Sequence, residues 1–241
     1  MRYAIISDIH ANLEALSTVL RALSLEKIDR YLCVGDIVGY GAEPEQCIER
    51  TLELDPVVVQ GNHDIASADL SGINSFNDIA REAAIWTHKK LSEKYKQLLK
   101  KLPLVYKNRF LTMAHGTLHE PQNFHYMLDR HAAILSFDNL KTKICFVGHS
   151  HVPGIFTYKG DLPEYFYSQT LKLEKSKKYI ANVGSVGQPR DGDPRACYCI
   201  YDKKNSSLEI RRVAYNVKKA QKKILAAGLP PYLAHRLGDG V

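Results

Sequence analysis

The sequence has no long apolar run. No stretch of its 241 residues approaches the roughly 18 consecutive apolar residues that a membrane-spanning helix needs. The short apolar run near its start, residues 3–6, gives way to Ser7 and Asp8 and is too short for a secretory leader. These absences predict a soluble cytoplasmic protein that has no membrane partner.

Cysteine is scarce, and its spacing shows no metal-binding or redox motif. There are five cysteines, an odd number, and no CxxC motif. Cys33, Cys145, Cys197 and Cys199 fall in apolar runs typical of strands, and Cys47 falls in a run typical of a helix. The odd number and the absence of CxxC disfavour both a disulfide framework and a thiolate metal site. The sequence therefore predicts buried, reduced thiols.

Positive charge is in moderate excess, with a formal net charge of +7. Many of the lysines lie between residues 89 and 101 on one amphipathic helical stretch, where a solvated helix face is the simpler interpretation. No basic groove with interleaved aromatic residues is evident. The composition favours a small anionic ligand and argues against a nucleic-acid polymer as a partner.

What remains is the pattern of an α/β fold. A hydrophobic content of 45% over 241 residues suffices for one large core, and no low-complexity linker interrupts it, so we expect one domain over residues 1–241. The first half alternates strand-like and helix-like runs, which predicts βαβ units, and the second half is rich in strands. We expect a four-layer αββα sandwich of two packed mixed β-sheets flanked by helices. The expected strands are 3–7, 31–35, 57–60, 104–107, 110–114, 143–147, 155–158, 165–173, 179–183, 196–202 and 208–213, and the expected helices are 13–27, 44–54, about 77–102 with a break near Ser92, 129–137, and one from about 217 onward.

Five of these strands lead directly into side chains that can bind metals. In open α/β sheets, ligands bind outside the carboxyl ends of the strands, so these side chains should meet in one crevice. The candidates are Asp8 and His10 after the first strand, Asp36 after the second, Asn62, His63 and Asp64 after the third, His115 after residues 110–114, and His149 and His151 after residues 143–147.

Spacing and chemistry indicate two ions. Residues two apart in an extended chain point the same way, so Asp8 with His10, and His149 with His151, could each hold one centre. Imidazole, carboxylate and carboxamide groups without a thiolate suit Mn²⁺, Zn²⁺, Fe or Ni²⁺. Seven candidate ligands, which exclude His63 and Asp64, are too many for one tetrahedral ion and match two ions that share a carboxylate.

Each residue also has an ordinary structural interpretation. A lone Asp after a strand is more often a turn residue or a helix cap, a lone His is more often a satisfied polar group, and Asn62 suits a left-handed turn. Five strands that all end in metal-binding residue types favour the metal centre when they are taken together.

The order of these groups resembles that of the calcineurin-like metallophosphoesterases. The matching motifs are DxH at Asp8–His10, GD at Gly35–Asp36, GNHD at Gly61–Asp64, HG at His115–Gly116 and GHxH at Gly148–His151. The match spans residues 5–151, and NVGSVGQPRDGDPRA, from Asn182, resembles a loop of small prokaryotic members. GD or HG alone would carry no weight, but the ordered set is specific. The resemblance implies a single calcineurin-like metallophosphoesterase domain over residues 1–241.

The resemblance also implies how the metal ligands divide. Two divalent ions are implied, most readily Mn²⁺, with Fe, Ni²⁺ or Zn²⁺ as alternatives. Asp8, His10 and His151 would hold one ion, Asn62, His115 and His149 would hold the other, and Asp36 would bridge them.

In the same family pattern, the pKa of a water that bridges the two ions is lowered towards about 7, and the hydroxide that forms attacks phosphorus in line. His63 would sit near the leaving oxygen without binding a metal, and would protonate this oxygen or stabilise its charge. Asp64 is expected in a turn or at a helix cap.

One departure from the family pattern bears on the substrate. Protein serine/threonine phosphatases continue the bridging motif as GDxxDRG, whereas this chain reads GDIVGYG, with Gly39 and Tyr40 in place of the acid and the arginine. The resemblance then favours a phosphodiesterase that acts on a small nucleotide-like substrate. A dinucleoside polyphosphate hydrolase, a protein serine/threonine phosphatase and a non-catalytic metal-binding scaffold are the alternatives, and the presence of His63 with all seven ligands disfavours the scaffold.

The stretch 182–196, rich in glycine and proline, has two interpretations. It is either a tight connection or a phosphate-binding loop in which Arg190 closes over the metals, with Ser185 or Gln188 nearby. A planar guanidinium can hold a second phosphate of the substrate through two hydrogen bonds, which supports Arg190 as a candidate substrate contact, with Ser185 as another.

The remaining histidines are expected away from the metals. His119, His125 and His131 are expected in a surface region, and His88 and His235 on helix surfaces. His125 or Tyr126 could contact a base or another leaving group. The sequence leaves the oligomeric state open.

Overall fold

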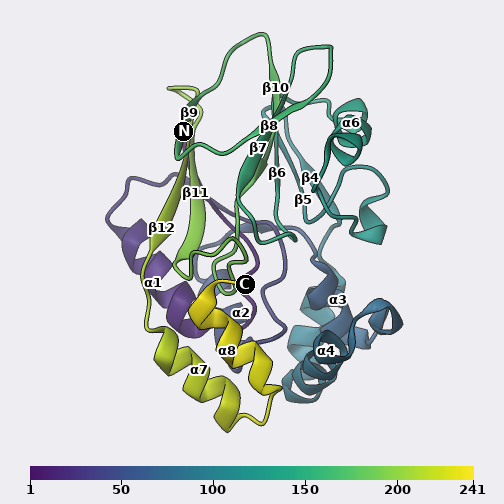
Figure 1. The fold of residues 1–241 in the computed structure, drawn as a ribbon, viewed down its shortest axis with the longest axis vertical. Coiled ribbons are helices and arrows are strands. Elements are labelled where there is room, and N and C mark those ends of the chain that lie inside the picture. Colours follow the sequence, from purple (N-terminus) through teal and green to yellow (C-terminus); the bar gives the residue numbers. More distant parts are fainter.

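Strand β1 (Arg2–Ile6) contributes to two apolar cores, because successive side chains of a strand point to opposite faces. Tyr3 and Ile5 belong to the core between two sheets, and Ala4 and Ile6 belong to the core beneath a layer of helices. The computed structural model describes residues 1–241, and in it β1 is an inner strand of one of two sheets. The two sheets pack together and helices lie on their outer faces (Figure 1).

The two sheets have six strands each. The first has the order β3-β2-β1-β11-β12-β9 and the second the order β4-β5-β6-β10-β7-β8. The other strands of the first sheet are β2 (Arg30–Cys33), β3 (Val57–Val58), β9 (Thr170–Lys172), β11 (Ala196–Asp202) and β12 (Ser207–Val213). The second sheet consists of β4 (Val105–Lys107), β5 (Leu111–Ala114), β6 (Ile144–Val147), β7 (Gly154–Tyr158), β8 (Glu164–Phe166) and β10 (Lys178–Asn182).

Each sheet contains one parallel block. In the first sheet β2 pairs in parallel with both β1 and β3, and Ile6 lies opposite Cys33. In the second sheet β6 pairs in parallel with both β5 and β10. The remaining pairings are antiparallel, so both sheets are mixed, as predicted.

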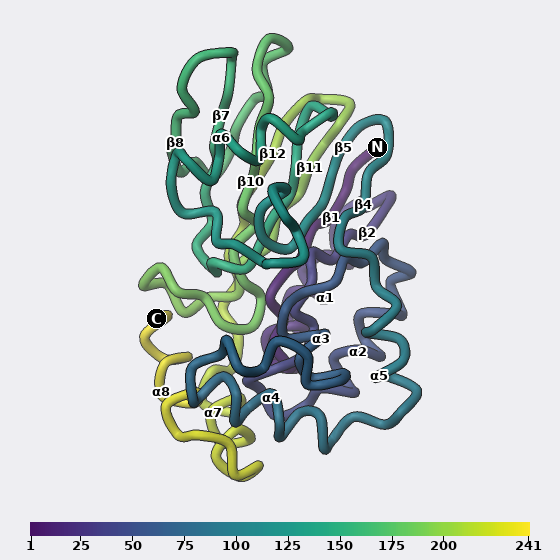
Figure 2. Tube along the Cα trace, turned by 90° about the vertical axis from the view of Figure 1, so that its right-hand side faces the viewer, coloured from purple at the N-terminus to yellow at the C-terminus, as the bar shows by residue number.

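Helices cover both outer faces. The helices are α1 (Leu13–Ser24), α2 (Pro44–Leu52), α3 (Asn62–Asp69), α4 (Asp78–Lys90), α5 (Glu93–Lys100), α6 (Arg130–Asn139), α7 (Val217–Ala226) and α8 (Pro231–Asp239). Helices α1, α2, α3 and α5 contribute to the core on the outer face of the first sheet, and α6 packs on the second. Helices α4, α7 and α8 share a separate apolar cluster, at the foot of the molecule in Figure 2.

Local sequence explains where several of these helices begin. The side chains of Asn12, Asn77, Asp129 and Asn216 each accept an N–H of the first helical turn, at the starts of α1, α4, α6 and α7. Such caps satisfy a donor that the helix itself leaves free. The expected break near Ser92 is confirmed, since α4 ends at Lys90 and α5 begins at Glu93.

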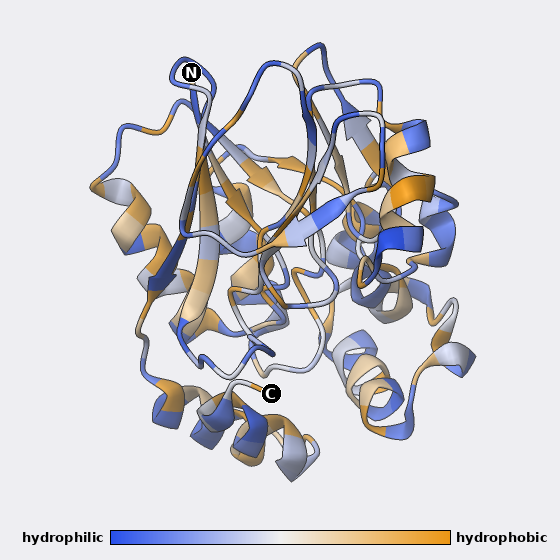
Figure 3. Cartoon of the chain, turned by 45° about the horizontal axis from the view of Figure 1, so that its top comes forward, coloured by the Kyte–Doolittle hydropathy of each residue, from blue (hydrophilic) through white to orange (hydrophobic).

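The predicted four-layer αββα sandwich is confirmed. Figure 3 shows apolar segments along the strands and polar segments on many outer turns and helix faces. All five cysteines are buried and free, which confirms that prediction too. None of the helices has the length and apolar character needed to cross a bilayer.

Three expected elements differ in the structure. The last helix is two helices, because Gly228 adopts a left-handed φ of 71° and Pro230 precedes α8. The strand expected at 165–173 is two short strands, β8 and β9, which belong to different sheets. The strand expected at 57–60 stops at Val58, and Asn62 already begins α3, which was not expected.

The core between the sheets gives a stability prediction. Ile5 is fully buried there, so Ile5→Ala should lower the free energy of unfolding by about 2–5 kcal/mol through lost burial and a residual cavity. Leu25→Ala, at a side chain that is 86% exposed, is the control and should change it by less than about 0.5 kcal/mol. Urea unfolding followed by circular dichroism measures both, and equal effects would contradict this placement of the core.

Candidate metal centre

The chain turns sharply after the strands that lead into the candidate metal ligands, and these turns determine where the ligand side chains point. Asp8 and His10 have φ values of 51° and 48°, and His149 and His151 have values of 67° and 60°. Left-handed backbone is uncommon for residues with a side chain and is found at functional sites. The expectation that each pair lies in extended chain is therefore wrong. His149 and His151 also fall in different groups, which corrects their pairing from spacing alone.

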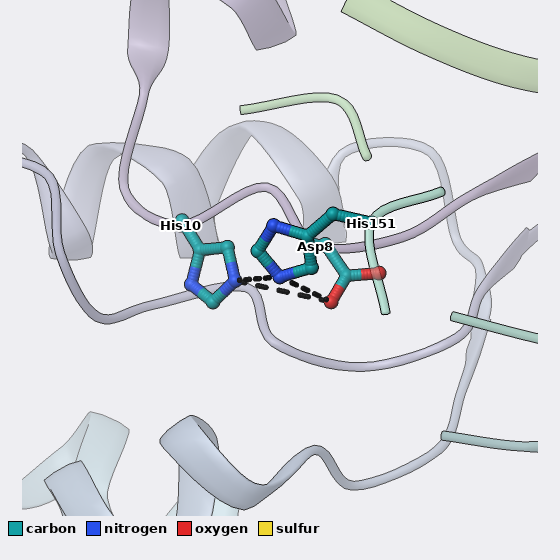
Figure 4. Close-up of side chains that lie close together, drawn as sticks. All are labelled: Asp8, His10 and His151. Carbon is teal, nitrogen blue, oxygen red and sulfur yellow. Dashed lines mark hydrogen bonds and ion pairs between the residues drawn. The ribbon is translucent and has the colours of Figure 1, made fainter. Parts of the chain in front are cut away.

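Asp8, His10 and His151 form the first group of buried ligand atoms, all within 4.8 Å of one another. Asp8 Oδ1 lies 3.8 Å from His10 Nε2 and 3.3 Å from His151 Nε2. Figure 4 shows the two rings and the carboxylate turned toward one point. His10 follows β1 and His151 follows β6, so the two sheets together build this group.

Backbone carbonyls determine which nitrogen of each ring faces the centre. His10 Nδ1 lies 3.1 Å from the carbonyl of Val38, and His151 Nδ1 lies 2.6 Å from that of Gln188. A carbonyl only accepts hydrogen bonds, so Nδ1 carries the proton and Nε2 of the neutral ring carries a lone pair. Burial lowers the pKa of both rings, which keeps them neutral at pH 7.

Two nitrogen lone pairs of the first group therefore face each other. The Nε2 atoms of His10 and His151 are 3.0 Å apart, and neither has a proton to share. Such an arrangement is repulsive unless a cation lies near both nitrogens, with Asp8 supplying negative charge. The donors of this group fit a divalent metal ion.

Asp36, His115 and His149 form the second group, again buried and within 4.8 Å of one another. His115 Nδ1 lies 2.7 Å from the carbonyl of Val34, which places the proton on that nitrogen as in the first group. Its Nε2 is buried without a hydrogen-bond partner. The ring of Tyr126 stacks on His149 with the centroids 4.0 Å apart. This group also offers nitrogen and oxygen donors that a metal ion would satisfy.

Asp36 lies between the two groups. Its Oδ2 is 3.6 Å from His10 Nε2 and 3.2 Å from His115 Nε2. Its Oδ1 accepts the backbone N–H of His63 at 2.8 Å, which fixes the carboxylate in this orientation. One oxygen of Asp36 thus faces ligand atoms of both groups, which is the position that a bridging ligand requires.

The buried carboxylates favour positive charge at the centre. Burial acts to raise the pKa of Asp8 and Asp36, but neighbouring imidazoles, His151 for Asp8 and His115 for Asp36, hold both below the usual range. Burial acts to lower the pKa of His115, yet Asp36 raises it to about 10. A site that so strongly stabilises a proton on a buried imidazole also suits a metal cation.

Asn62 and His63 begin α3 and line a pocket of about 230 Å³ that His149 also lines. Asn62 Oδ1 and His63 Nδ1 are buried without hydrogen-bond partners. Burial lowers the pKa of His63 to about 4, and its ring packs against Tyr40 and Phe76 with centroid distances of 4.3 and 4.7 Å. His63 lies beside the centre without belonging to either group of ligands.

Asp64 is the helix-capping residue that was expected, and it also holds the loop that carries Asp36. Its Oδ1 accepts the N–H groups of Ile37 and Val38 at 2.9 and 3.3 Å, and its Oδ2 those of Asp36 and Gly61 at 2.9 and 3.1 Å. Burial and the nearby Asp36 carboxylate raise the pKa of Asp64 to about 7, and the backbone donors oppose that rise. Sequence reasoning missed this positioning role.

Gly61 allows two loops of the centre to meet. A Cβ atom on this residue would lie 2.1 Å from Oδ1 of Asp36 and 2.3 Å from its backbone nitrogen. Any larger residue would displace the Asp36 loop or the start of α3. This contact is the physical reason for the glycine that precedes Asn62.

Ser185 lies beneath the site and not at its surface. Its hydroxyl donates to the carbonyl of Asp8 at 2.8 Å and accepts the N–H of Gln188 at 2.8 Å, and the residue is fully buried. A substrate cannot reach this hydroxyl. The structure gives Ser185 a positioning role in place of the predicted substrate contact.

Arg190 lies at the edge of the centre. Its Nη2 donates to Gln188 Oε1 at 2.7 Å, its guanidinium lies 5.7 Å from the ring centroid of Tyr40, and its Nε is buried without a partner. The positive charge of Arg190 contributes to lowering the pKa of both His63 and His151. The structure thus places Arg190 near the centre and free of any carboxylate within 4.0 Å.

The other histidines lie outside both groups, as predicted. His119, His125 and His131 line a separate pocket. His88 is half-buried on α4 and donates to a backbone carbonyl at 2.9 Å, and His235 is exposed on α8. None of these residues belongs to the metal centre.

Sequence reasoning missed most of the aromatic lining of the pocket. Tyr40, Phe76 and Phe124 line it together with Tyr126, the only one of the four that the sequence marked as a contact. Phe76 and Phe124 follow short 3₁₀ turns, Ile73–Ser75 and Pro121–Asn123, where no hydrophobic period marks them. A phenylalanine within a polar loop was the one available signal.

Comparisons relate the chain to metallophosphoesterases. The model of a family described as "Calcineurin-like phosphoesterase superfamily domain" matches residues 1–206. Uncharacterized protein MJ0912 of Methanocaldococcus jannaschii is 38% identical over 239 residues, which cover 97% of this chain and 96% of that protein. A metallophosphoesterase structure from Sphaerobacter thermophilus is 38% identical, with a TM-score of 0.88 and 100% coverage of both chains. Hypothetical protein PH1004 from Pyrococcus horikoshii shares the fold at 19% identity, with a TM-score of 0.80 over 100% of this chain and 98% of that one.

The contacts of Asp64 give a prediction about the centre. Asp64→Asn replaces one acceptor oxygen with an amide that cannot accept, and leaves two backbone N–H groups facing it. We expect the free energy of unfolding to fall by about 1–3 kcal/mol for each donor left without a partner, and metal retention to weaken as the Asp36 loop shifts.

Asp69→Asn is the matched control, because Asp69 is exposed near the end of the same helix and its carboxylate accepts only the N–H of Ser71. Urea unfolding and metal content after desalting measure both variants. If Asp64→Asn unfolded at the same urea concentration as Asp69→Asn, the positioning role of Asp64 would be wrong.

Proposed function

Because the chain belongs to the calcineurin-like phosphoesterase superfamily, whose members are hydrolases of phosphoester bonds, we propose that it is a phosphodiesterase with two divalent metal ions. Its substrate would be a small nucleotide-like phosphodiester. The observation that carries the proposal is the position of Asp36, one oxygen of which faces His10 in the first group and His115 in the second.

The proposed ligands follow from this geometry. Asp8, His10 and His151 would hold one ion and His115 and His149 the other, with Asp36 between them. Asn62 would complete the second set through its unpartnered Oδ1, which lies at the same pocket as His149. Ions bound there would polarise the phosphate oxygens and lower the pKa of a water nucleophile.

The chain's own residues orient these ligands. The carbonyls of Val34, Val38 and Gln188 keep the proton on Nδ1 of His115, His10 and His151 respectively. Nε2 of His10 and of His151 therefore presents its lone pair to the centre without a change of tautomer, and Nε2 of His115 would do so once an arriving ion displaces the proton that Asp36 stabilises on that ring. Such fixed orientation strengthens binding, because no reorganisation is needed when an ion arrives.

His63 is the proposed catalytic residue. It lies at the same pocket as His149, and its Nδ1 has no partner within the protein. An N–H of this ring would donate to the leaving oxygen of the ester and stabilise the charge that develops there. Arg190, whose Nε also lacks a partner, would contact a phosphate oxygen from the edge of the centre.

Two observations favour a small substrate. Tyr40 stands where protein serine/threonine phosphatases carry an arginine, and its ring packs against His63 instead of offering a phosphate ligand. The pocket beside the proposed metal centre is lined by aromatic and carboxamide side chains such as Phe124 and Asn123. Such a lining suits a base or another organic group on the ester.

A non-catalytic scaffold remains the alternative from a different class. Buried polar atoms without partners, here Asn62 Oδ1, His63 Nδ1 and His115 Nε2, each lower stability by about 1–3 kcal/mol. A scaffold would gain nothing from these groups, whereas a metal-dependent hydrolase uses them. The preference for Mn²⁺ over Fe, Ni²⁺ or Zn²⁺, the cytoplasmic location and the absence of a nucleic-acid or membrane partner stay predictions.

The assay that tests the proposal compares His63→Ala with wild type on bis-p-nitrophenyl phosphate and p-nitrophenyl phosphate, with and without Mn²⁺. We expect metal-dependent turnover that is faster on the diester, and a fall in kcat of about 10²–10⁴ in the variant with its metal content unchanged. His235→Ala, on the exposed face of α8, is the matched control and should behave as wild type. Wild-type turnover by a His63→Ala protein would remove this residue from the mechanism.

A further inference from the structure

Three adjoining pockets form one cleft that passes the metal centre. The middle pocket, of about 230 Å³, contains His63 and His149. A pocket of about 550 Å³ shares Tyr40, Asn77 and Tyr126 with it on one side. A pocket of about 470 Å³ on the other side shares lining residues that include Asn62, Phe76 and Phe124. We call the pocket of about 550 Å³ the Arg236 arm and the pocket of about 470 Å³ the Phe76 arm.

The two arms differ in charge. The Phe76 arm is lined only by uncharged side chains, among them Gln60, Gln122 and Leu104. The Arg236 arm is lined by two arginines, Arg190 and Arg236. Its one acid, Asp78, already forms an ion pair with Arg81. The cleft is therefore neutral at one end and basic at the other.

Neither arginine of the Arg236 arm forms an ion pair with an acidic side chain. No Asp or Glu carboxylate lies within 4.0 Å of either guanidinium, although other arginines of the chain, such as Arg195 and Arg212, do form such pairs. Arg190 Nε is buried without a partner, and Arg236 donates through Nε to the oxygen of Val241, the last residue, which leaves both of its Nη groups without a protein partner. Burial lowers the pKa of Arg236, and the charge of Arg190 lowers it further, so the two positive groups repel each other.

The backbone beneath Arg236 is held in place by packing. Arg236 lies on α8, whose Leu233 and Leu237 pack in one apolar cluster with Ala83 of α4. Its guanidinium lies 5.2 Å from the ring centroid of Tyr232. Arg190 lies on a loop, where its N–H bonds to the carbonyl of His151 and its Nη2 to Gln188 Oε1. Two guanidiniums with N–H groups that lack protein partners form a site suited to an anion, because binding relieves their repulsion.

We infer that the Arg236 arm binds a second phosphate of the substrate, while the phosphate to be cleaved lies at the metal centre. This inference deepens the proposed function and rests on it. The guanidiniums of Arg190 and Arg236 would each donate two hydrogen bonds to phosphate oxygens. An uncharged part of the substrate would lie in the Phe76 arm. The substrate class is then a phosphate ester or anhydride that carries at least one further phosphate on one side only of the reacting phosphorus.

The test measures inhibition of bis-p-nitrophenyl phosphate hydrolysis by inorganic phosphate and by tripolyphosphate, with free Mn²⁺ held constant because tripolyphosphate binds it. For wild type we expect the inhibition constant of tripolyphosphate to be lower by about tenfold or more, since only tripolyphosphate can occupy both sites. The ratio of the inhibition constant of phosphate to that of tripolyphosphate should fall towards one in Arg236→Gln. In Arg236→Lys this ratio should lie between the values of Arg236→Gln and wild type.

Lys222→Gln is the matched control, because it removes one positive charge from an exposed position on neighbouring α7 and should preserve the wild-type ratio. An unchanged ratio in Arg236→Gln, with its fold intact by circular dichroism, would overturn the inference. If Arg236→Gln failed to fold, Arg236→Lys would serve in its place, and a wild-type ratio of inhibition constants in that variant would overturn the inference.

Calorimetric titration of the metal-loaded protein with tripolyphosphate separates this inference from the proposed function. Weaker binding to Arg236→Gln than to Lys222→Gln, in a protein without turnover on any substrate, would support the phosphate site and contradict the phosphodiesterase. Turnover of the diester combined with equal tripolyphosphate affinity in both variants would support the enzyme and overturn the phosphate site.

Discussion

Lone pairs on buried imidazoles, set against buried carboxylates, are the constraint on which the rest of this structure depends. His10 and His151 present their Nε2 atoms to each other at 3.0 Å, and Asp8 and Asp36 add negative charge where water cannot screen it. Positive charge is needed to make this arrangement favourable. The surrounding fold prevents the side chains from relaxing, because backbone carbonyls fix the rings and Asp64 holds the loop of Asp36 with four backbone hydrogen bonds.

The sandwich explains how one chain can build such a centre. Each sheet has one parallel block, and the site residues leave the carboxyl ends of β1, β2 and β3 in one sheet and of β5 and β6 in the other. Neither sheet could supply both groups of ligands by itself, since Asp8 and His10 come from the first sheet and His151 from the second. The packing of the two sheets therefore also determines the distances within the metal centre.

Sequence reasoning reached the architecture and the residues of the centre, because apolar strands that end in Asp, Asn and His are visible without a structure. It failed where conformation departs from regular geometry. The left-handed backbone at His149 and His151 separates residues that extended chain would pair, and Gly228 divides the last helix. Contacts between distant segments could not be predicted either. Ser185 donates to the carbonyl of Asp8, and Arg236 comes near Arg190 because α8 packs against α4 and Gly240 accepts the N–H of Gly192.

The central claim is that the two groups of ligands bind two metal ions through a shared carboxylate. The most direct measurement is the metal content per chain of the wild type and of Asp36→Asn, by elemental analysis after loading with Mn²⁺ and desalting. The account predicts two ions per wild-type chain, one for each group, and loss of both in the variant. No retained metal in the wild type, or two ions retained by Asp36→Asn, would contradict it.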